Sequence, residues 1–162
     1  MPADYQRVNR TARQLLAKYE LTTPPFDPEA IAEAEGFDVI YRNFDADISA
    51  HISGYSDANT DSIYVNKAIP PSRKIFTIAH ELAHLILHRD YVRNDGLYQV
   101  LPRRNFYGEE KPVEEKEADA FAAELLVPLE CLRRYKLLAS DDELARLFAV
   151  SGEVIENRSK WL

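Results

Sequence analysis

Residues 73–88 read Arg-Lys-Ile-Phe-Thr-Ile-Ala-His-Glu-Leu-Ala-His-Leu-Ile-Leu-His and contain the pattern His-Glu-x-x-His at positions 80–84. On a helix, positions i and i+4 lie about 40° apart around the axis and roughly 6 Å along it. His80 and His84 at this spacing can bind one metal ion, and Glu81 can face a water molecule beside that ion. Two ligands and a general base within so short a segment are the pattern of a hydrolytic zinc site.

The residues around this motif predict a buried helix. Pro70 and Pro71 end any preceding helix, and Ser72 is expected to cap the next one. The residues that follow are apolar on almost every face, which is typical of a helix in the protein interior. Buried histidines need partners for their ring nitrogens. Ordinary hydrogen bonds within a core are therefore the alternative to metal binding.

A catalytic zinc site takes three protein ligands and leaves a fourth position open. His88 lies about 12 Å along the helix axis from His80, which is too far to share one ion. His51 lies in a stretch typical of a strand and stays open as a ligand. The better candidates are the acidic residues of segment 113–128.

Segment 113–128 predicts a second helix, which Pro128 ends. Its apolar residues form one stripe at i, i+3, i+4, i+7 and i+8, namely Ala118, Phe121, Ala122, Leu125 and Leu126. Glu115 lies on the side of this stripe, whereas Glu114 and Glu117 lean toward water. Asp119 is placed to accept a proton from the second ring nitrogen of a ligating histidine. The alternative is that these acids form a solvated helix face.

The two helices together resemble the ImmA/IrrE family of metallopeptidases. The resemblance rests on RKIFTIAHELAHLILH at 73–88, EEKEADAFAAELLVP at 114–128 and the lead-in ISGYSDANTDSIYVN at 52–66, and it covers roughly residues 10–135.

This resemblance implies a gluzincin-like site with His80, His84 and Glu115 as ligands, Glu81 as the base and Asp119 as a supporting residue. It also implies that the substrate is a helix-turn-helix repressor of a mobile element, a toxin–antitoxin operon or a stress-response operon.

The remaining sequence predicts a mainly helical α+β fold of the zincin type, in one domain over 1–162. Helices are expected over 4–20 and from Pro28 to Gly36. Strands are expected over 37–41, 52–55 and 62–65, and they are predicted to form a small three-stranded antiparallel sheet ahead of the histidine helix.

The tail, about residues 138–162, has the rhythm of two helices around Val150-Ser151-Gly152, which resembles half of a helix-turn-helix. Residues 141–162 hold five acidic residues against three basic ones, the wrong sign for a DNA-facing element. We therefore expect a packing module or a partner surface behind a catalytic core of about 10–135, and no direct binding of nucleic acid.

Composition sets further bounds. The 162 residues are 46% hydrophobic, enough for a core, and the net charge of −7 opposes nonspecific binding to phosphates. We expect no membrane span, because the longest apolar runs are short. The polar N-terminus lacks a secretion signal. Cys131 is the only cysteine, so no internal disulfide forms, and we expect a cytoplasmic protein with Cys131 as buried filler.

Two regions are candidates for substrate contacts. A sheet edge beside the metal can take a peptide as an added strand, although an ordinary edge fits equally well. Residues 89–112 form a long connection of the kind that serves as a lid or binding loop. In it, Arg103 and Arg104 could contact an acidic substrate, and Tyr98 or Tyr107 could stabilise an oxyanion, although a solvated loop fits as well.

The sequence therefore predicts a zinc metallo-endopeptidase that acts on a protein substrate, with Glu81 as general base. Two histidines and a carboxylate also suit Mn²⁺. The alternative is a dormant or non-catalytic protein that sequesters a transcriptional repressor.

Overall fold

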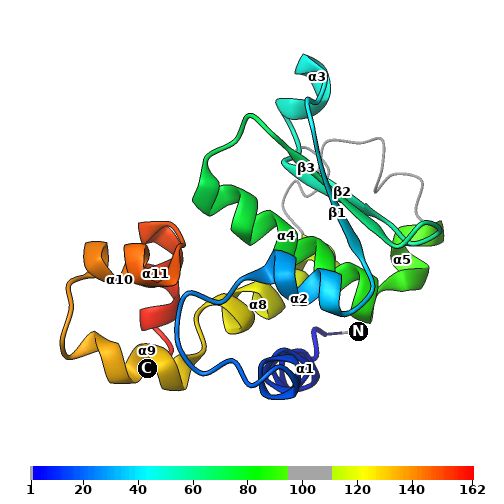
Figure 1. The fold of residues 1–162 in the computed structure, drawn as a ribbon. Helices are drawn as coiled ribbons and strands as arrows, with labels where there is room; N and C mark the ends of the chain where they lie inside the picture. Colours follow the sequence, from blue (N-terminus) through cyan, green and yellow to red (C-terminus); the bar gives the residue numbers. More distant parts are fainter. Residues whose placement is uncertain (1, 95–110) are drawn as a thin grey trace.

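The computed structural model describes residues 2–94 and 111–162. Figure 1 shows a mainly helical α+β fold with one small sheet, as the sequence predicts. Its strands are β1 (Asp38–Arg42), β2 (Gly54–Asp57) and β3 (Ser62–Asn66). Its helices are α1 (Tyr5–Lys18), α2 (Pro28–Ala34), α3 (Ala46–Ser49), α4 (Pro71–Leu87), α5 (Arg89–Asn94), α8 (Val113–Leu126), α9 (Leu129–Lys136), α10 (Asp141–Phe148) and α11 (Gly152–Ser159).

The sheet is mixed, with strand order β1-β3-β2. Strands β2 and β3 pair antiparallel, with Ser56 opposite Ile63, but β1 and β3 pair parallel, with Val39 opposite Ile63. The predicted all-antiparallel sheet is therefore wrong for one of its two pairs. Segment 43–61 is long enough to return the chain in the same direction, which a parallel pair requires. Helix α3, which the sequence did not predict, lies in this crossover.

Helix α4 lies between the sheet and α8, and α8 in turn lies between α4 and α1 (Figure 1). The sheet contributes Ile63 and Val65 to the core, and both are fully buried. Helix α4 begins at Pro71, so the predicted capping role of Ser72 is wrong: Pro70 holds the N-cap position. Proline fits the first turn of a helix because its missing N–H has no partner there anyway.

Helix α8 ends just before Pro128, as predicted, and its apolar stripe is fully buried. The prediction that Glu117 leans toward water is wrong. Glu117 is 5% exposed, and its carboxylate accepts a hydrogen bond of 2.8 Å from the backbone N–H of Asp4. Arg7 of α1 lies 3.5 Å from the same carboxylate. The N-terminal segment thus covers the face of α8 that carries Glu117, which the sequence pattern predicts to be exposed to water.

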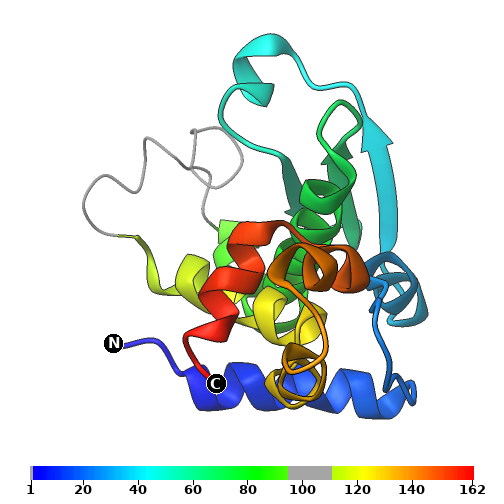
Figure 2. The same cartoon turned by 90° about the vertical axis from the view of Figure 1, so that its left-hand side faces the viewer.

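The tail forms the two expected helices, α10 and α11, joined through Ala149 in a left-handed conformation. Figure 2 shows the two helices side by side. Leu144, Phe148 and Ile155 belong to the same apolar cluster as the α4 and α8 residues. The buried Arg158 pairs with Glu124 of α8 and donates a 2.9 Å hydrogen bond to the carbonyl of Val127.

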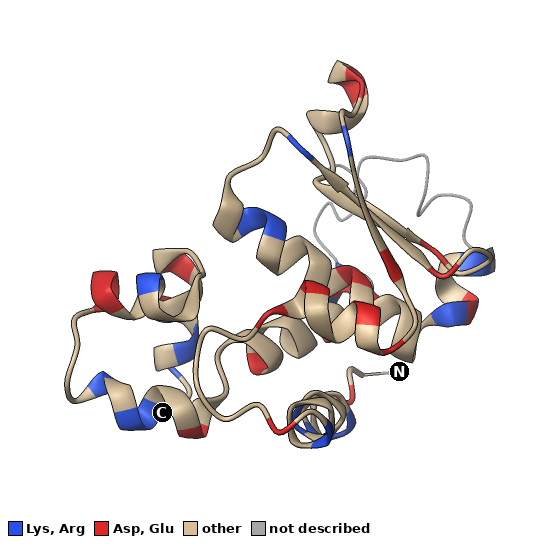
Figure 3. Cartoon of the chain, in the orientation of Figure 1, with Lys and Arg blue, Asp and Glu red and all other residues tan. Residues whose placement is uncertain are grey.

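Charges of both signs alternate over this part of the molecule (Figure 3). The first turn of α10 is acidic, and the last turn of α9 is basic. Separately, none of the helices in 2–94 and 111–162 has the length and apolar character that a membrane crossing demands.

Gly54 is a position where the fold tolerates no side chain. A Cβ atom there would lie 2.5 Å from the carbonyl oxygen of Tyr64 and 2.6 Å from Cγ2 of Thr77 on α4. We expect Gly54→Ala to lower the free energy of unfolding by about 1–3 kcal/mol, because overpacking forces β2 away from its neighbours. Thermal denaturation measures this effect. Gly152→Ala is the matched control, since a Cβ atom there meets no atom within 4 Å. Equal melting temperatures for the two variants would contradict the prediction.

Candidate metal centre

Helices α4 and α8 bring three ligand atoms together in the core. His80 and His84 lie one turn apart on α4, and Glu115 lies on α8, fully buried. Nε2 of His80 is 3.0 Å from Oε1 of Glu115, and Nε2 of His84 is 2.9 Å from Oε2. The two Nε2 atoms are 3.2 Å apart. The atoms that the sequence predicts as metal ligands therefore face one point.

The chemistry of this donor set fits a divalent metal ion. One ligand atom from each of the three residues lies within 4.8 Å of the other two. Two imidazoles and one carboxylate are a known protein ligand set of catalytic zinc. Both histidines direct Nε2 toward the common point, and the second nitrogen of each ring bonds elsewhere. Within the described residues, this is the cluster of His, Cys, Asp and Glu side chains with metal-binding spacing.

Asp119 contacts His80 on the side of the ring that faces away from the common point. Its Oδ1 atom lies 2.9 Å from Nδ1 of His80, and its second oxygen pairs with Lys111. A carboxylate on Nδ1 fixes the orientation of the ring and leaves Nε2 for the metal.

The pKa values reflect the close packing of these charges. Burial lowers the pKa of His80, but the hydrogen bonds to Asp119 and Glu115 outweigh burial and raise it to about 10. Burial lowers the pKa of His84 to about 4, although Glu115 opposes the shift. Burial raises the pKa values of Glu115 and Asp119, yet the neighbouring histidines reverse this effect, so both carboxyls have lowered pKa values. The acids are therefore ionised at neutral pH.

Glu81 is completely buried on α4. The hydroxyl of Ser56, on strand β2, donates a 3.1 Å hydrogen bond to Oε2 of Glu81. Glu81 lies on the same helix as both histidines, and its charge partly opposes the lowering of the His84 pKa. The edge strand of the sheet thus contacts the predicted base directly.

Sequence reasoning missed three residues that hold the centre. Tyr91 of α5 donates a 3.0 Å hydrogen bond to Oε2 of Glu115. Ser56 contacts Glu81, and Lys111 contacts Asp119. Segment 89–112 reads as an irregular connection, so nothing in the pattern points to Tyr91. The strand expected over 52–55 ends one residue before Ser56, whereas β2 runs from Gly54 to Asp57, so the pattern gave no reason to place Ser56 beside Glu81.

The other residues considered from the sequence lie apart from the cluster. His51 lies in the turn after α3, and its buried Nδ1 atom has no hydrogen-bond partner among the described residues. His88 lies at the end of α4, outside the three-ligand group. Cys131 is free and buried, and burial raises its pKa. Tyr98, Tyr107, Arg103 and Arg104 lie outside the described residues.

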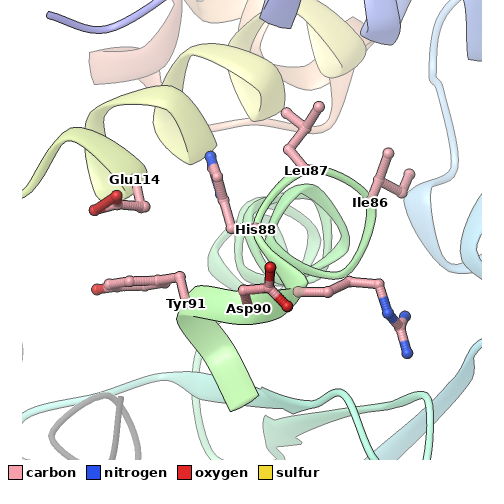
Figure 4. A pocket seen from close by; sticks show the side chains of 7 residues that line it. Ile86, Leu87, His88, Asp90, Tyr91 and Glu114 are labelled. Atoms are coloured by element: carbon pink, nitrogen blue, oxygen red, sulfur yellow. The ribbon is translucent and has the colours of Figure 1, made fainter. Parts of the chain in front are cut away.

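A hollow of about 390 Å³ adjoins the centre at the end of α4. In Figure 4, Glu114 projects from α8 on one side, and Tyr91 projects from α5 on the other. Tyr91 is shared between this hollow and the Glu115 carboxylate. The rest of the lining comes from Ile86, Leu87, His88, Arg89 and Asp90.

A helix bearing His-Glu-x-x-His, joined by a glutamate from a second helix, defines a metallopeptidase of the HExxH class. The chain belongs to the peptidase M78 family, whose IrrE N-terminal-like domain matches residues 32–160. This agrees with the resemblance carried by the two sequence motifs and extends it into the tail.

The fold also occurs in a solved structure with a different sequence. The chain is similar to a Mycobacterium tuberculosis transcriptional regulator, with a TM-score of 0.65 and 20% identity. The match covers 94% of this chain and 55% of the regulator, so the chain spans about half the length of that protein. No curated protein is significantly similar in sequence.

Replacing Glu115 tests the ligand set. We expect Glu115→Ala to lose most of the zinc that the wild type carries, because two histidines alone leave the site one ligand short. Mass spectrometry of the metal content, on folded protein purified without added metal, measures this loss. Glu114→Ala is the matched control, since Glu114 is the adjacent residue and lies outside the cluster. Equal zinc in both variants would remove Glu115 from the ligand set.

The pKa values predict proton release on metal binding. In the metal-free protein near pH 7.5, His80 carries a proton, because its pKa is about 10, and His84 is neutral, because its pKa is about 4. A metal at Nε2 of His80 must displace that proton. We expect about one proton to be released per ion. Zinc affinity should therefore fall about tenfold for each unit by which the pH is lowered between these two pKa values. Calorimetry in two buffers of different ionisation enthalpy measures the release, and identical heats would contradict it.

Proposed function

We propose that this chain is a zinc-dependent endopeptidase that cleaves a helix-turn-helix transcriptional repressor. The observation that carries the proposal is the buried convergence of His80, His84 and Glu115, with Glu81 on the same helix. Membership of the M78 family supports the reaction class.

His80, His84 and Glu115 would hold the zinc ion. Bound there, zinc acts as a Lewis acid that lowers the pKa of water and polarises the scissile carbonyl. Manganese suits the same donor set, so the metal assignment rests on the preference of two imidazoles and one carboxylate for zinc in hydrolytic sites.

Glu81 would act as the general base. Its carboxylate takes a proton from the attacking water and then passes that proton to the leaving amine. The hydroxyl of Ser56 holds Oε2 of Glu81 in place. Burial of Glu81 keeps bulk water away and thereby strengthens its electrostatic interaction with the reacting groups.

We propose that the substrate backbone binds along strand β2. It is an edge strand within the described sheet, and it carries the serine that contacts Glu81. A peptide added along β2 would form backbone hydrogen bonds and lie extended beside the base. This mode binds many sequences, so the selection of the bond to be cut must come from side-chain contacts.

The repressor as substrate follows from the family resemblance. The similar fold in a Mycobacterium tuberculosis transcriptional regulator is consistent with a role of this domain in transcriptional control. The acidic chain, with a net charge of −7, would act on the repressor itself and not on its DNA. A cytoplasmic location suits this substrate and the single free cysteine.

Glu81→Gln separates catalysis from metal binding. We expect this variant to keep its zinc and to cleave a candidate repressor about 10²–10⁴-fold more slowly, because an amide cannot accept the proton. Gel electrophoresis of a panel of helix-turn-helix repressors, incubated with wild type and variant, measures the rate.

Three outcomes distinguish the zinc peptidase from a protein that only sequesters the repressor, and test the role of Glu81. Cleavage at the wild-type rate by Glu81→Gln would remove Glu81 from the mechanism. Stable binding of a repressor by a zinc-loaded wild type that never cuts it would favour sequestration. A wild type that takes up no zinc would overturn the zinc peptidase.

A further inference from the structure

His88 lies one turn beyond His84 and forms a second layer behind the centre. It is 7% exposed and bonds through both ring nitrogens. Its Nδ1 atom is 3.1 Å from Nδ1 of His84, and its Nε2 atom is 2.8 Å from Oε1 of Glu117. The spacing along α4 that rules out His88 as a ligand of the same ion therefore places it against the Nδ1 side of His84.

We propose that Glu117 and His88 form a relay that fixes the tautomer and the ring orientation of His84. The inference rests on the proposed function, because it assigns a positioning role toward the same metal. Glu117 is the fixed end, since an ionised carboxylate only accepts hydrogen bonds.

The positions of the protons on His88 and His84 follow from the carboxylate of Glu117. Nε2 of His88 must carry the hydrogen that Glu117 accepts, so Nδ1 of a neutral His88 has a lone pair. Nδ1 of His84 must then donate, and Nε2 of His84 is left with the lone pair that a metal needs. Nε2 of His84 is also within hydrogen-bond distance of Nε2 of His80, at 3.2 Å. Oε2 of Glu115 lies 2.9 Å from the same Nε2 atom of His84. This direction of donation therefore satisfies both contacts of His88 and leaves Nε2 of His84 facing the two atoms with which it would share the ion.

Glu117 is anchored by groups remote from the motif. The backbone N–H of Asp4 donates to its Oε2 atom at 2.8 Å, and Arg7 lies 3.5 Å from Oε1. A positive charge and an N–H donor fix the orientation of this nearly buried carboxylate. The N-terminal segment thereby sets the geometry of a residue on α4.

The relay gives the two ligand histidines equivalent support. Asp119 contacts Nδ1 of His80 directly, at 2.9 Å. Glu117 does not contact His84 itself: it bonds to Nε2 of His88, and Nδ1 of His88 contacts Nδ1 of His84. Loss of such a partner usually weakens metal binding about 10–100-fold.

A pair of substitutions at His88 tests the relay. His88→Leu removes the acceptor, and we expect zinc affinity, measured by competition with a chelating dye, to fall about 10–100-fold. His88→Asn keeps an acceptor bonded to Cγ, where Nδ1 stood, and we expect it to recover most of that loss. Thermal denaturation reports whether each variant folds. Equal affinities for folded His88→Leu and His88→Asn, or for His88→Leu and wild type, would overturn the relay.

Imidazole nitrogen NMR on wild-type protein gives a readout that needs no variant and no activity. We expect His88 to be protonated at Nε2 alone, and His84 at Nδ1 alone, in the metal-free protein. Among the ring nitrogens of His84 and His88, zinc should shift only Nε2 of His84. A hydrogen on Nδ1 of His88 would reverse the direction of donation and overturn the relay.

The two failures can be told apart. A wild type that binds no zinc defeats the proposed function, while the metal-free NMR spectrum still decides the relay. A wild type that binds zinc tightly, and does so equally well without an acceptor at position 88, defeats the relay alone.

Discussion

The centre depends on how closely two helices approach. A glutamate side chain is short, so Glu115 can reach both histidines only if the backbone of α8 lies near that of α4. Ala79 and Ala83 on α4, and Ala118 and Ala122 on α8, are all fully buried. Small side chains allow this approach without leaving a void. The sheet on the other side of α4 then fixes the rotation of that helix, and with it the direction of Glu81.

Helix α8 is also the part of the chain that joins the remaining elements. Three of its carboxylates are buried, and each has partners that are far away in the sequence. Glu115 meets α4, Glu117 meets the N-terminal segment, and Glu124 meets α1 and α11 through Arg13 and Arg158. Removing one partner of a buried pair leaves an uncompensated charge, which is costly. The N-terminal helix and the tail are thus tied to the same helix that supplies the third ligand.

The features that were predicted correctly from the sequence are those that depend on helix geometry over a few turns. The spacing of His80 and His84 and the stripe that carries Glu115 depend on residues within a few turns, and the structure brings these atoms together. The parallel pairing of β1 with β3 and the burial of Glu117 depend on residues far away in the chain. The spacing of apolar residues within one helix or strand therefore cannot predict them. Tyr91 and Ser56 were missed for the same reason: their roles exist only once α5 and β2 pack against the ligand helices.

The contact between Asp4 and Glu117 joins positions 113 residues apart, and that between Arg13 and Glu124 joins positions 111 apart. During synthesis, α1 therefore lacks the helix it packs on until α8 leaves the ribosome. The same segment delivers Glu115, so the nascent chain acquires its complete ligand set at the moment when its first helix can dock. Until then the two histidines lack Glu115 beside them, so the proposed metal centre stays incomplete while most of the chain has already left the ribosome.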